Sequence, residues 1–170
     1  MPKISKFKEQ RVGVLVDIQN LYYSGKVLHG KKVNFNKVLE ESVSGRKFIR
    51  AIAYGIRTAE GLEEKFFEAL ENQGFEVKTK DLQIFPGGAK KGDWDVGIAV
   101  DAIKMSKSLD VIVLASGDGD YIPMVEYIQN TTGCRVEIIA FQESSSAKLI
   151  TTADSFINMS QNKRKFLITR

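Results

Sequence analysis

The chain has 170 residues, of which 43% are hydrophobic and 27% are charged, with three prolines and fourteen glycines. These values are typical of one globular domain, and they argue against collagen-like, low-complexity or wholly disordered character. Lysine and arginine number 25 against 21 aspartates and glutamates, a net charge of +4 that favours an anionic partner.

Cysteine and histidine each occur once, as Cys134 and His29, which is too few for an internal disulfide or a zinc site of the usual ligand sets. The first apolar run, residues 12–16, is too short for a signal peptide or a membrane span. We therefore expect a cytoplasmic protein.

Strands and helices are predicted to alternate along the chain. Residues 12–16 form a continuous apolar run with three β-branched valines, which is typical of a buried parallel strand. Similar runs predict strands over 48–54, 75–79, 110–115 and 135–141. Helical spacing predicts helices over 59–72, over 121–130, and from about residue 93 with Val96, Ala99, Val100 and Ile103 toward the core. This order favours an α/β fold, a three-layer sandwich with a mainly parallel sheet and right-handed crossovers.

The predicted domain spans residues 11–160, with no internal repeat and no linker that would divide it. Residues 25–46 are the least regular stretch and predict one short helix near 36–41. Residues 1–10 and 161–170 are polar and basic and are expected to be tails, although residues 166–168 could dock as a short edge strand.

Acidic residues follow two of the predicted core strands. Asp17 ends the first strand, and Asp118 and Asp120 follow the strand over 110–115. Ligands of parallel sheets bind at the carboxyl ends of strands, so neighbouring strands would bring these carboxylates together. Hard oxygen donors favour Mg²⁺ or Mn²⁺. The alternative is that each aspartate only forms a turn or caps a helix.

A third acidic group lies around the start of the helix predicted near residue 93. Asp93 and Asp95 precede or open this helix, and Asp101 lies about 240° around it from Asp95 at ~100° per residue. We take Asp95 as the metal ligand, with Asp93 and Asp101 as alternates. Lys91 just before the helix is a candidate phosphate contact.

Three motifs in one order, VLVDIQN, KGDWDVGIAVDAI and VLASGDGDYIPMV, resemble the NYN domain of the LabA-like family in the PIN-like nuclease superfamily. The resemblance covers roughly residues 11–158. It implies a PIN-like (Rossmann-like) topology in which the first and fourth strands are adjacent, with an acidic cluster at their ends. It assigns catalysis and metal binding to Asp17, Asp95, Asp118 and Asp120. Tyr121 stands where an aromatic residue, often Phe, usually follows.

The implied activity is divalent-metal-dependent hydrolysis of RNA by activated water, which gives 5′-phosphate and 3′-hydroxyl ends. Asn20, Lys91 and Ser116 would contact the substrate. Tyr22 and Trp94 could stack on unpaired bases, which favours single-stranded RNA. Lysines near both segments would neutralise phosphates, the residues being Lys26, Lys31, Lys32, Lys37, Lys90 and Lys91.

Other classes of protein fit less well. A dehalogenase-type phosphatase needs an aspartate where Gln19 stands, and the chain has neither a G-x-S-x-G motif nor a P-loop. The serious alternative is a catalytically weak or silent RNA-binding or regulatory module with the same fold. A homodimer that builds a joint groove is compatible with the sequence, although no sequence feature establishes it.

Overall fold

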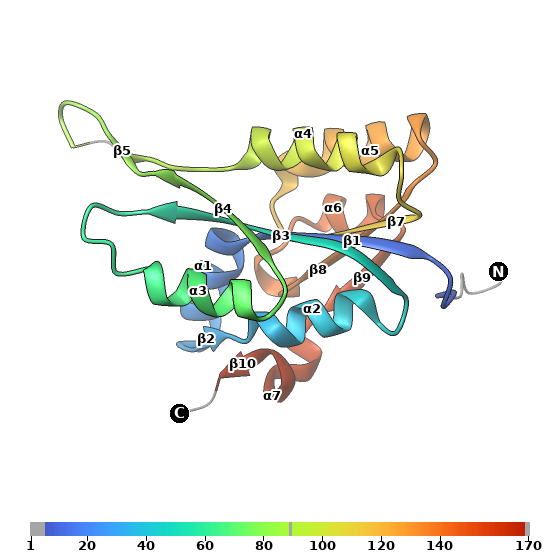
Figure 1. Cartoon of the computed structure of the whole chain (residues 1–170), viewed down its shortest axis with the longest axis horizontal. Coiled ribbons are helices and arrows are strands. Elements are labelled where there is room, and N and C mark those ends of the chain that lie inside the picture. The colour runs from blue at the N-terminus through green and yellow to red at the C-terminus, as the bar shows by residue number, and fades with distance from the viewer. Residues whose placement is uncertain (1–5, 89, 169–170) are drawn as a thin grey trace.

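A parallel six-stranded sheet forms the centre of the molecule in the computed structural model, which describes residues 6–88 and 90–168 (Figure 1). The strand order is β4-β3-β1-β7-β8-β9, and every neighbouring pair is parallel. The strands are β1 (Arg11–Asp17), β3 (Lys47–Arg57), β4 (Glu76–Asp81), β7 (Val111–Ala115), β8 (Arg135–Ala140) and β9 (Ser155–Asn158). Since β7 is the fourth strand that the sequence predicts, the predicted adjacency of the first and fourth strands is confirmed.

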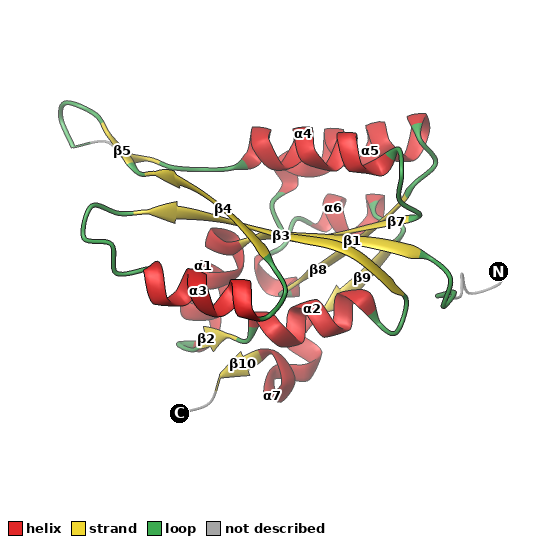
Figure 2. Ribbon diagram, in the orientation of Figure 1, coloured by secondary structure: helices red, strands yellow, loops and turns green. Residues whose placement is uncertain are grey.

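Helices cover both faces of the sheet and complete the predicted three layers (Figure 2). One face carries α1 (Ile18–His29), α2 (Phe35–Val43), α3 (Glu64–Asn72) and α7 (Lys163–Phe166). The other face carries α4 (Asp95–Ser106), α5 (Ile122–Thr131) and α6 (Ala147–Thr152). The short elements are β2 (Lys32–Val33), β5 (Gln83–Ile84), β6 (Lys90–Lys91), β10 (Leu167–Ile168), and the 3₁₀ turns η1 (Gly119–Tyr121), η2 (Gln142–Ser144) and η3 (Met159–Asn162).

The core lies on the central strands. All five residues of β7 are buried, and so is β1 after its first residue. A strand that is covered by helices on both faces has no polar side, which explains the continuous apolar runs.

The helix α1 was not predicted by the sequence. The polar run after the first strand reads as a loop, but Asp17 caps a helix there, with its side chain accepting a hydrogen bond from the Asn20 N–H. The strand β9 was also missed, because its half-buried residues lack a strong apolar run.

The orientation predicted for α4 was wrong in part, since Ala99 and Ile103 do pack against the core. Val96 and Val100, placed toward the core, are 76% and 48% exposed. Ile98 and Ala102 are buried instead. The helix has two apolar stripes, and the one with Ile98 and Ala102 is the more deeply buried.

The last described residues pack against the domain. The strand β10 pairs antiparallel with β2, and Phe166 and Leu167 are buried. Residues 167–168 of the expected tail thus form a strand, but in a separate two-stranded sheet with β2 and not at the edge of the main sheet, and Phe166 belongs to α7.

Candidate metal centre

The carboxyl ends of β1 and β7 meet where the strand order of the sheet reverses. From β1 the chain moves outward to β3 and β4, then crosses back to β7 on the other side of β1. Crevices at such reversal points are the usual ligand sites of open parallel sheets. The segments that follow these two strands are therefore the place to expect a binding site.

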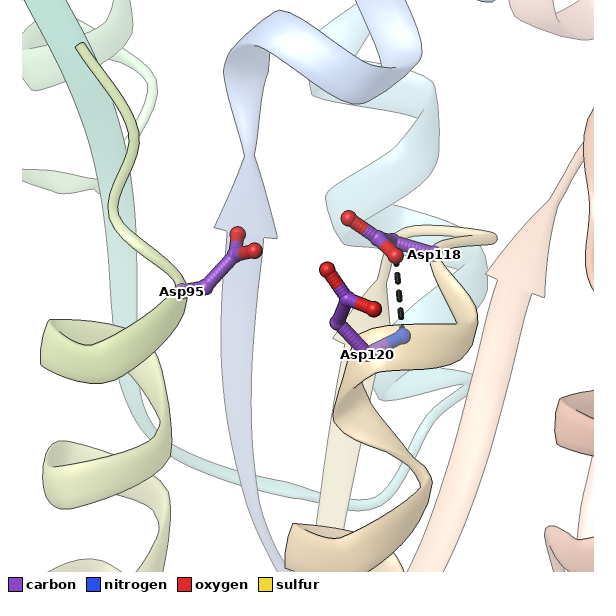
Figure 3. Close-up of side chains that lie close together, drawn as sticks. All are labelled: Asp95, Asp118 and Asp120. Carbon is purple, nitrogen blue, oxygen red and sulfur yellow. Dashed lines mark hydrogen bonds between the residues drawn. The ribbon is translucent and has the colours of Figure 1, made fainter. Parts of the chain in front are cut away.

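Three carboxylates converge at this point. Oxygens of Asp95, Asp118 and Asp120 all lie within 4.8 Å of one another. Figure 3 shows Asp95 reaching from the start of α4 on one side of β1, and Asp118 and Asp120 from the turn after β7 on the other. Asp118 also fixes the turn, because its Oδ1 accepts a hydrogen bond from the Asp120 N–H at 2.9 Å.

Asp17 lies beside this group but is buried and already hydrogen-bonded. Its Oδ2 accepts a hydrogen bond from the Ser116 hydroxyl at 3.3 Å, and its Oδ1 accepts one from the Asn20 N–H at 3.3 Å. Burial raises the pKa of Asp17 from 3.8 to about 6. Asp17 does not belong to the set of oxygens within 4.8 Å that Asp95, Asp118 and Asp120 form.

Tyr121 connects Asp17 to the three carboxylates. Its hydroxyl lies 3.1 Å from Asp17 Oδ2 and 3.1 Å from Asp95 Oδ1, and the side chain is buried. We assigned Tyr121 no role from the sequence. The sequence offered one indication of a role, since this chain has Tyr, with a hydroxyl group, at a motif position that is often Phe.

The three carboxylates form a region of concentrated negative charge. The pKa of Asp95 is raised first by burial and then by repulsion from Asp118, Asp93 and Asp120. A cation relieves such repulsion, and carboxylate oxygens are the donors that Mg²⁺ and Mn²⁺ prefer. The donor set therefore fits a hard divalent cation.

Polar side chains tie the loop after β7 to α1. The Gly117 N–H donates to Asn20 Oδ1 at 3.0 Å, and the Asp118 N–H donates to the Ser116 hydroxyl at 3.2 Å. A Cβ atom on Gly117 would lie 2.2 Å from Ser145 Oγ, so this position accepts only glycine without a shift of the backbone nearby. Asn20 and Ser116 thus hold the loop that carries Asp118.

The two alternate metal ligands lie outside the group of three. Asp101 accepts hydrogen bonds from the Tyr54 hydroxyl and from Lys78 Nζ, both at 2.8 Å, and these interactions lower its pKa despite partial burial. Asp93 is exposed and accepts a hydrogen bond from the Asp95 N–H at 3.3 Å, an Asx turn just before α4.

The residues assigned to RNA contact are spread over several elements. Trp94 packs against Tyr54 and donates from Nε1 to the Gly55 carbonyl at 2.9 Å. Tyr22 is 41% exposed on α1. Lys91 lies in β6, and its side chain is outside the part of the chain that the structure describes.

The fold and site together define an α/β domain with an acidic group at the reversal point of a parallel sheet. The NYN domain model matches residues 11–160, and the chain belongs to the NYN domain family, which has a PIN-like nuclease fold. The cyanobacterial "low amplitude and bright protein LabA" of Synechococcus elongatus is 22% identical over 162 residues, which is 90% of this chain and 86% of that protein.

A solved structure supports the same fold. A protein of unknown function from Vibrio parahaemolyticus is 31% identical, with a TM-score of 0.86 over 97% of this chain and all of the other. The NYN match suggests binding of nucleic acid. Over the described residues, no helix has the length and apolar character needed to cross a membrane.

Proposed function

We propose that this protein is a divalent-metal-dependent ribonuclease that hydrolyses phosphodiester bonds in single-stranded RNA. The observation that carries the proposal is the convergence of Asp95, Asp118 and Asp120 within 4.8 Å at the reversal point of an NYN domain. NYN domains are generally nucleases, and this chain keeps an acidic group where the fold places its ligands.

The chain's own residues have distinct roles in this proposal. Asp95, Asp118 and Asp120 hold Mg²⁺ or Mn²⁺, and Asp17 completes the site from its buried position. When bound, the ion supplies Lewis-acid polarisation of the phosphate and lowers the pKa of a bound water. Asn20 and Ser116 keep the loop with Asp118 in place, so that the carboxylates stay aligned for the phosphate.

The chemistry of the chain favours attack by water over attack by the RNA's own 2′-hydroxyl. The second route uses a paired acid and base, commonly histidines. His29 is the only histidine, and it lies at the end of α1 opposite to the acidic site. We therefore expect products with 5′-phosphate and 3′-hydroxyl ends.

The test compares cleavage of end-labelled single-stranded RNA by the wild type, Asp118→Asn and Asp101→Asn. Asp101 is the matched control, since it is a half-buried carboxylate on α4 outside the acidic group. We expect cleavage with Mg²⁺ or Mn²⁺ that is lost in excess EDTA and in Asp118→Asn and kept in Asp101→Asn. RNA binding without cleavage in any metal would instead favour a regulatory RNA-binding module.

A further inference from the structure

We propose that the exposed face of α1 guides single-stranded RNA from the acidic site to a lysine-lined pocket at the other end of this helix. We call this surface the α1 track, and it consists of Tyr22, Tyr23, Lys26, Lys31 and Lys32. The inference rests on the proposed function, because it names the surface that receives the substrate of that site.

The track starts at the acidic site. α1 begins at the residue after Asp17, and Figure 3 shows β1 passing between Asp95 and Asp118 before it leads into this helix. Exposed residues of α1 recur at positions 19, 22, 23, 26 and 27, the spacing of one helical face. One continuous stripe therefore leaves the site along the helix.

Two tyrosines stand at the start of this stripe. The side chain of Tyr22 is 41% exposed and that of Tyr23 is 72% exposed. Exposed aromatic rings provide stacking surfaces for unpaired bases, whereas the bases of a duplex are already stacked on one another. The beginning of the track therefore fits a single strand.

A pocket lies where α1 ends. It has a volume of about 460 Å³ and is lined by Lys26, Gly30, Lys31, Lys32 and Ile168. Gly30 ends the helix with φ of +63°, a left-handed conformation that favours glycine and turns the chain back. This turn brings Lys31 and Lys32 to the same pocket as Lys26.

Among the residues that the structure describes, no acidic side chain pairs with the lysines of this pocket. Residues 18–39 contain four lysines and no aspartate or glutamate. Lys37 is paired with Glu40, whereas no carboxylate in the described part of the chain forms an ion pair with Lys26, Lys31 or Lys32. Three lysines around one pocket, with no ion-pair partner among the described residues, favour phosphate groups of a nucleic acid backbone.

The length of α1 sets the length of RNA that the track can hold. Its 12 residues extend about 18 Å at 1.5 Å per residue. At roughly 3.4 Å per stacked nucleotide, this distance corresponds to about five nucleotides between the acidic site and the pocket.

The experiment measures binding of labelled oligouridylates of two to twelve nucleotides to full-length protein carrying Asp118→Asn, with Mg²⁺ present. We expect affinity to rise with length up to about six nucleotides and then to level off. Replacing Lys26, Lys31 and Lys32 by Ala should reduce the slope of log K against log salt by about 2, at ~0.7 per phosphate contact on a single strand. Replacement of the exposed Lys8, Lys104 and Lys107 is the control with the same change of charge.

A second pair of variants tests the stacking. Tyr22→Ala should weaken binding about 5- to 150-fold, the range for loss of one base stack. Tyr127→Ala is the control, because Tyr127 is 49% exposed on α5, on the opposite face of the sheet. Equal salt slopes for the two lysine triples, or equal binding by the two tyrosine variants, would overturn the track.

The two proposals fail differently. If the wild type cleaves RNA and the α1 variants bind and cleave normally, the ribonuclease stands and the track is wrong. If no metal supports cleavage but binding still depends on the α1 lysines and Tyr22, the track stands and the ribonuclease is wrong. Equal affinity for duplex RNA would contradict a track for single strands.

Discussion

Removal of the Tyr121 hydroxyl should weaken metal binding while the core stays packed. This hydroxyl has one proton and two carboxylate neighbours, Asp17 and Asp95, each at 3.1 Å. It can donate to only one of them at a time, so it links a buried carboxylate to one in the acidic group of Asp95, Asp118 and Asp120. In Tyr121→Phe both lose this partner. Asp17 keeps its hydrogen bonds from the Ser116 hydroxyl and the Asn20 N–H, whereas Asp95 loses the hydroxyl that holds its Oδ1.

The size of the effect follows from two known magnitudes. Loss of a hydrogen bond that orients a ligand costs about 10- to 100-fold in metal affinity, or about 1.4 to 2.7 kcal/mol. The Tyr121 hydrogen bond also lowers the pKa of Asp17, so the pKa of that carboxyl should rise above about 6 in Tyr121→Phe. The pH at which metal binding reaches half of its maximum should rise with it.

A matched variant separates this effect from a general loss of stability. Tyr54 is as buried as Tyr121, and its hydroxyl donates to Asp101 at 2.8 Å, outside the acidic group. Both Tyr→Phe variants should unfold at lower urea concentration, each losing about 1 to 2 kcal/mol. Titration calorimetry with Mn²⁺ at pH 7.5 is the assay. Equal Mn²⁺ affinities of Tyr121→Phe and Tyr54→Phe would refute the reasoning.

Three further predictions concern stability and the loop after β7. The raised pKa of Asp17 means that the folded protein binds a proton more tightly than the unfolded chain, so metal-free stability falls as pH rises from about 4 to about 6. Asp17→Asn should therefore stabilise the metal-free protein by up to about 3 kcal/mol at pH 7.5 and not at pH 3.5. Urea unfolding measures this, and a free energy of unfolding that changes with pH in the same way in the wild type and in Asp17→Asn would contradict it. Glu137→Gln should cost about 3 to 5 kcal/mol in the same assay, because it leaves Arg46 buried without its anion, and a cost under 1 kcal/mol would show that the pair is not needed. Gly117→Ala should reduce Mn²⁺ affinity tenfold or more, since its Cβ would displace Ser145. The control Gly133→Ala, at φ of +69°, should cost only about 1 kcal/mol of stability. Normal Mn²⁺ binding by Gly117→Ala would show that the loop after β7 does not position the metal ligands.

The convergence of acidic residues could be predicted because it depends on topology. Parallel strands place their carboxyl ends at one edge, so aspartates after the first and fourth strands must lie near each other once these strands are neighbours. The choice of Asp95 over Asp101 also follows from position, since the first turn of α4 lies at that edge and its second turn does not.

Other features depend on contacts that the sequence does not encode locally. The spacing of Val96 and Val100 identifies a helix, but Ile98 and Ala102 offer a second apolar stripe, and only packing selects between them. Likewise, the position of Tyr121 under two carboxylates arises from three separate segments. A motif can indicate an aromatic residue there, but it does not indicate what the hydroxyl contacts.

Two buried carboxylates of the sheet, Glu137 within β8 and Asp17 at the end of β1, have opposite surroundings, and this contrast is an argument for a cation. Glu137 is fully buried, and Arg46 and Arg135 lie 2.8 and 2.9 Å from its oxygens, so its pKa is lowered despite burial. Its contribution to stability is present above its unfolded pKa of about 4.5 and is lost as pH falls below its folded pKa.

Asp17 receives only hydroxyl and amide donors, and in the described part of the chain no lysine or arginine pairs with Asp17, Asp95, Asp118 or Asp120. The described residues thus supply two arginines to Glu137, whereas none of them pairs a lysine or arginine with the four carboxylates at the carboxyl ends of the strands. For Asp17 and Asp95 the lack of such a partner is costly, because burial raises the pKa of both carboxyls and so disfavours their ionised forms. An arginine at this edge would remove the cost but would also occupy the place of an external ion. Among the described residues no arginine takes this place. A site that binds a cation from solution needs this place to be open.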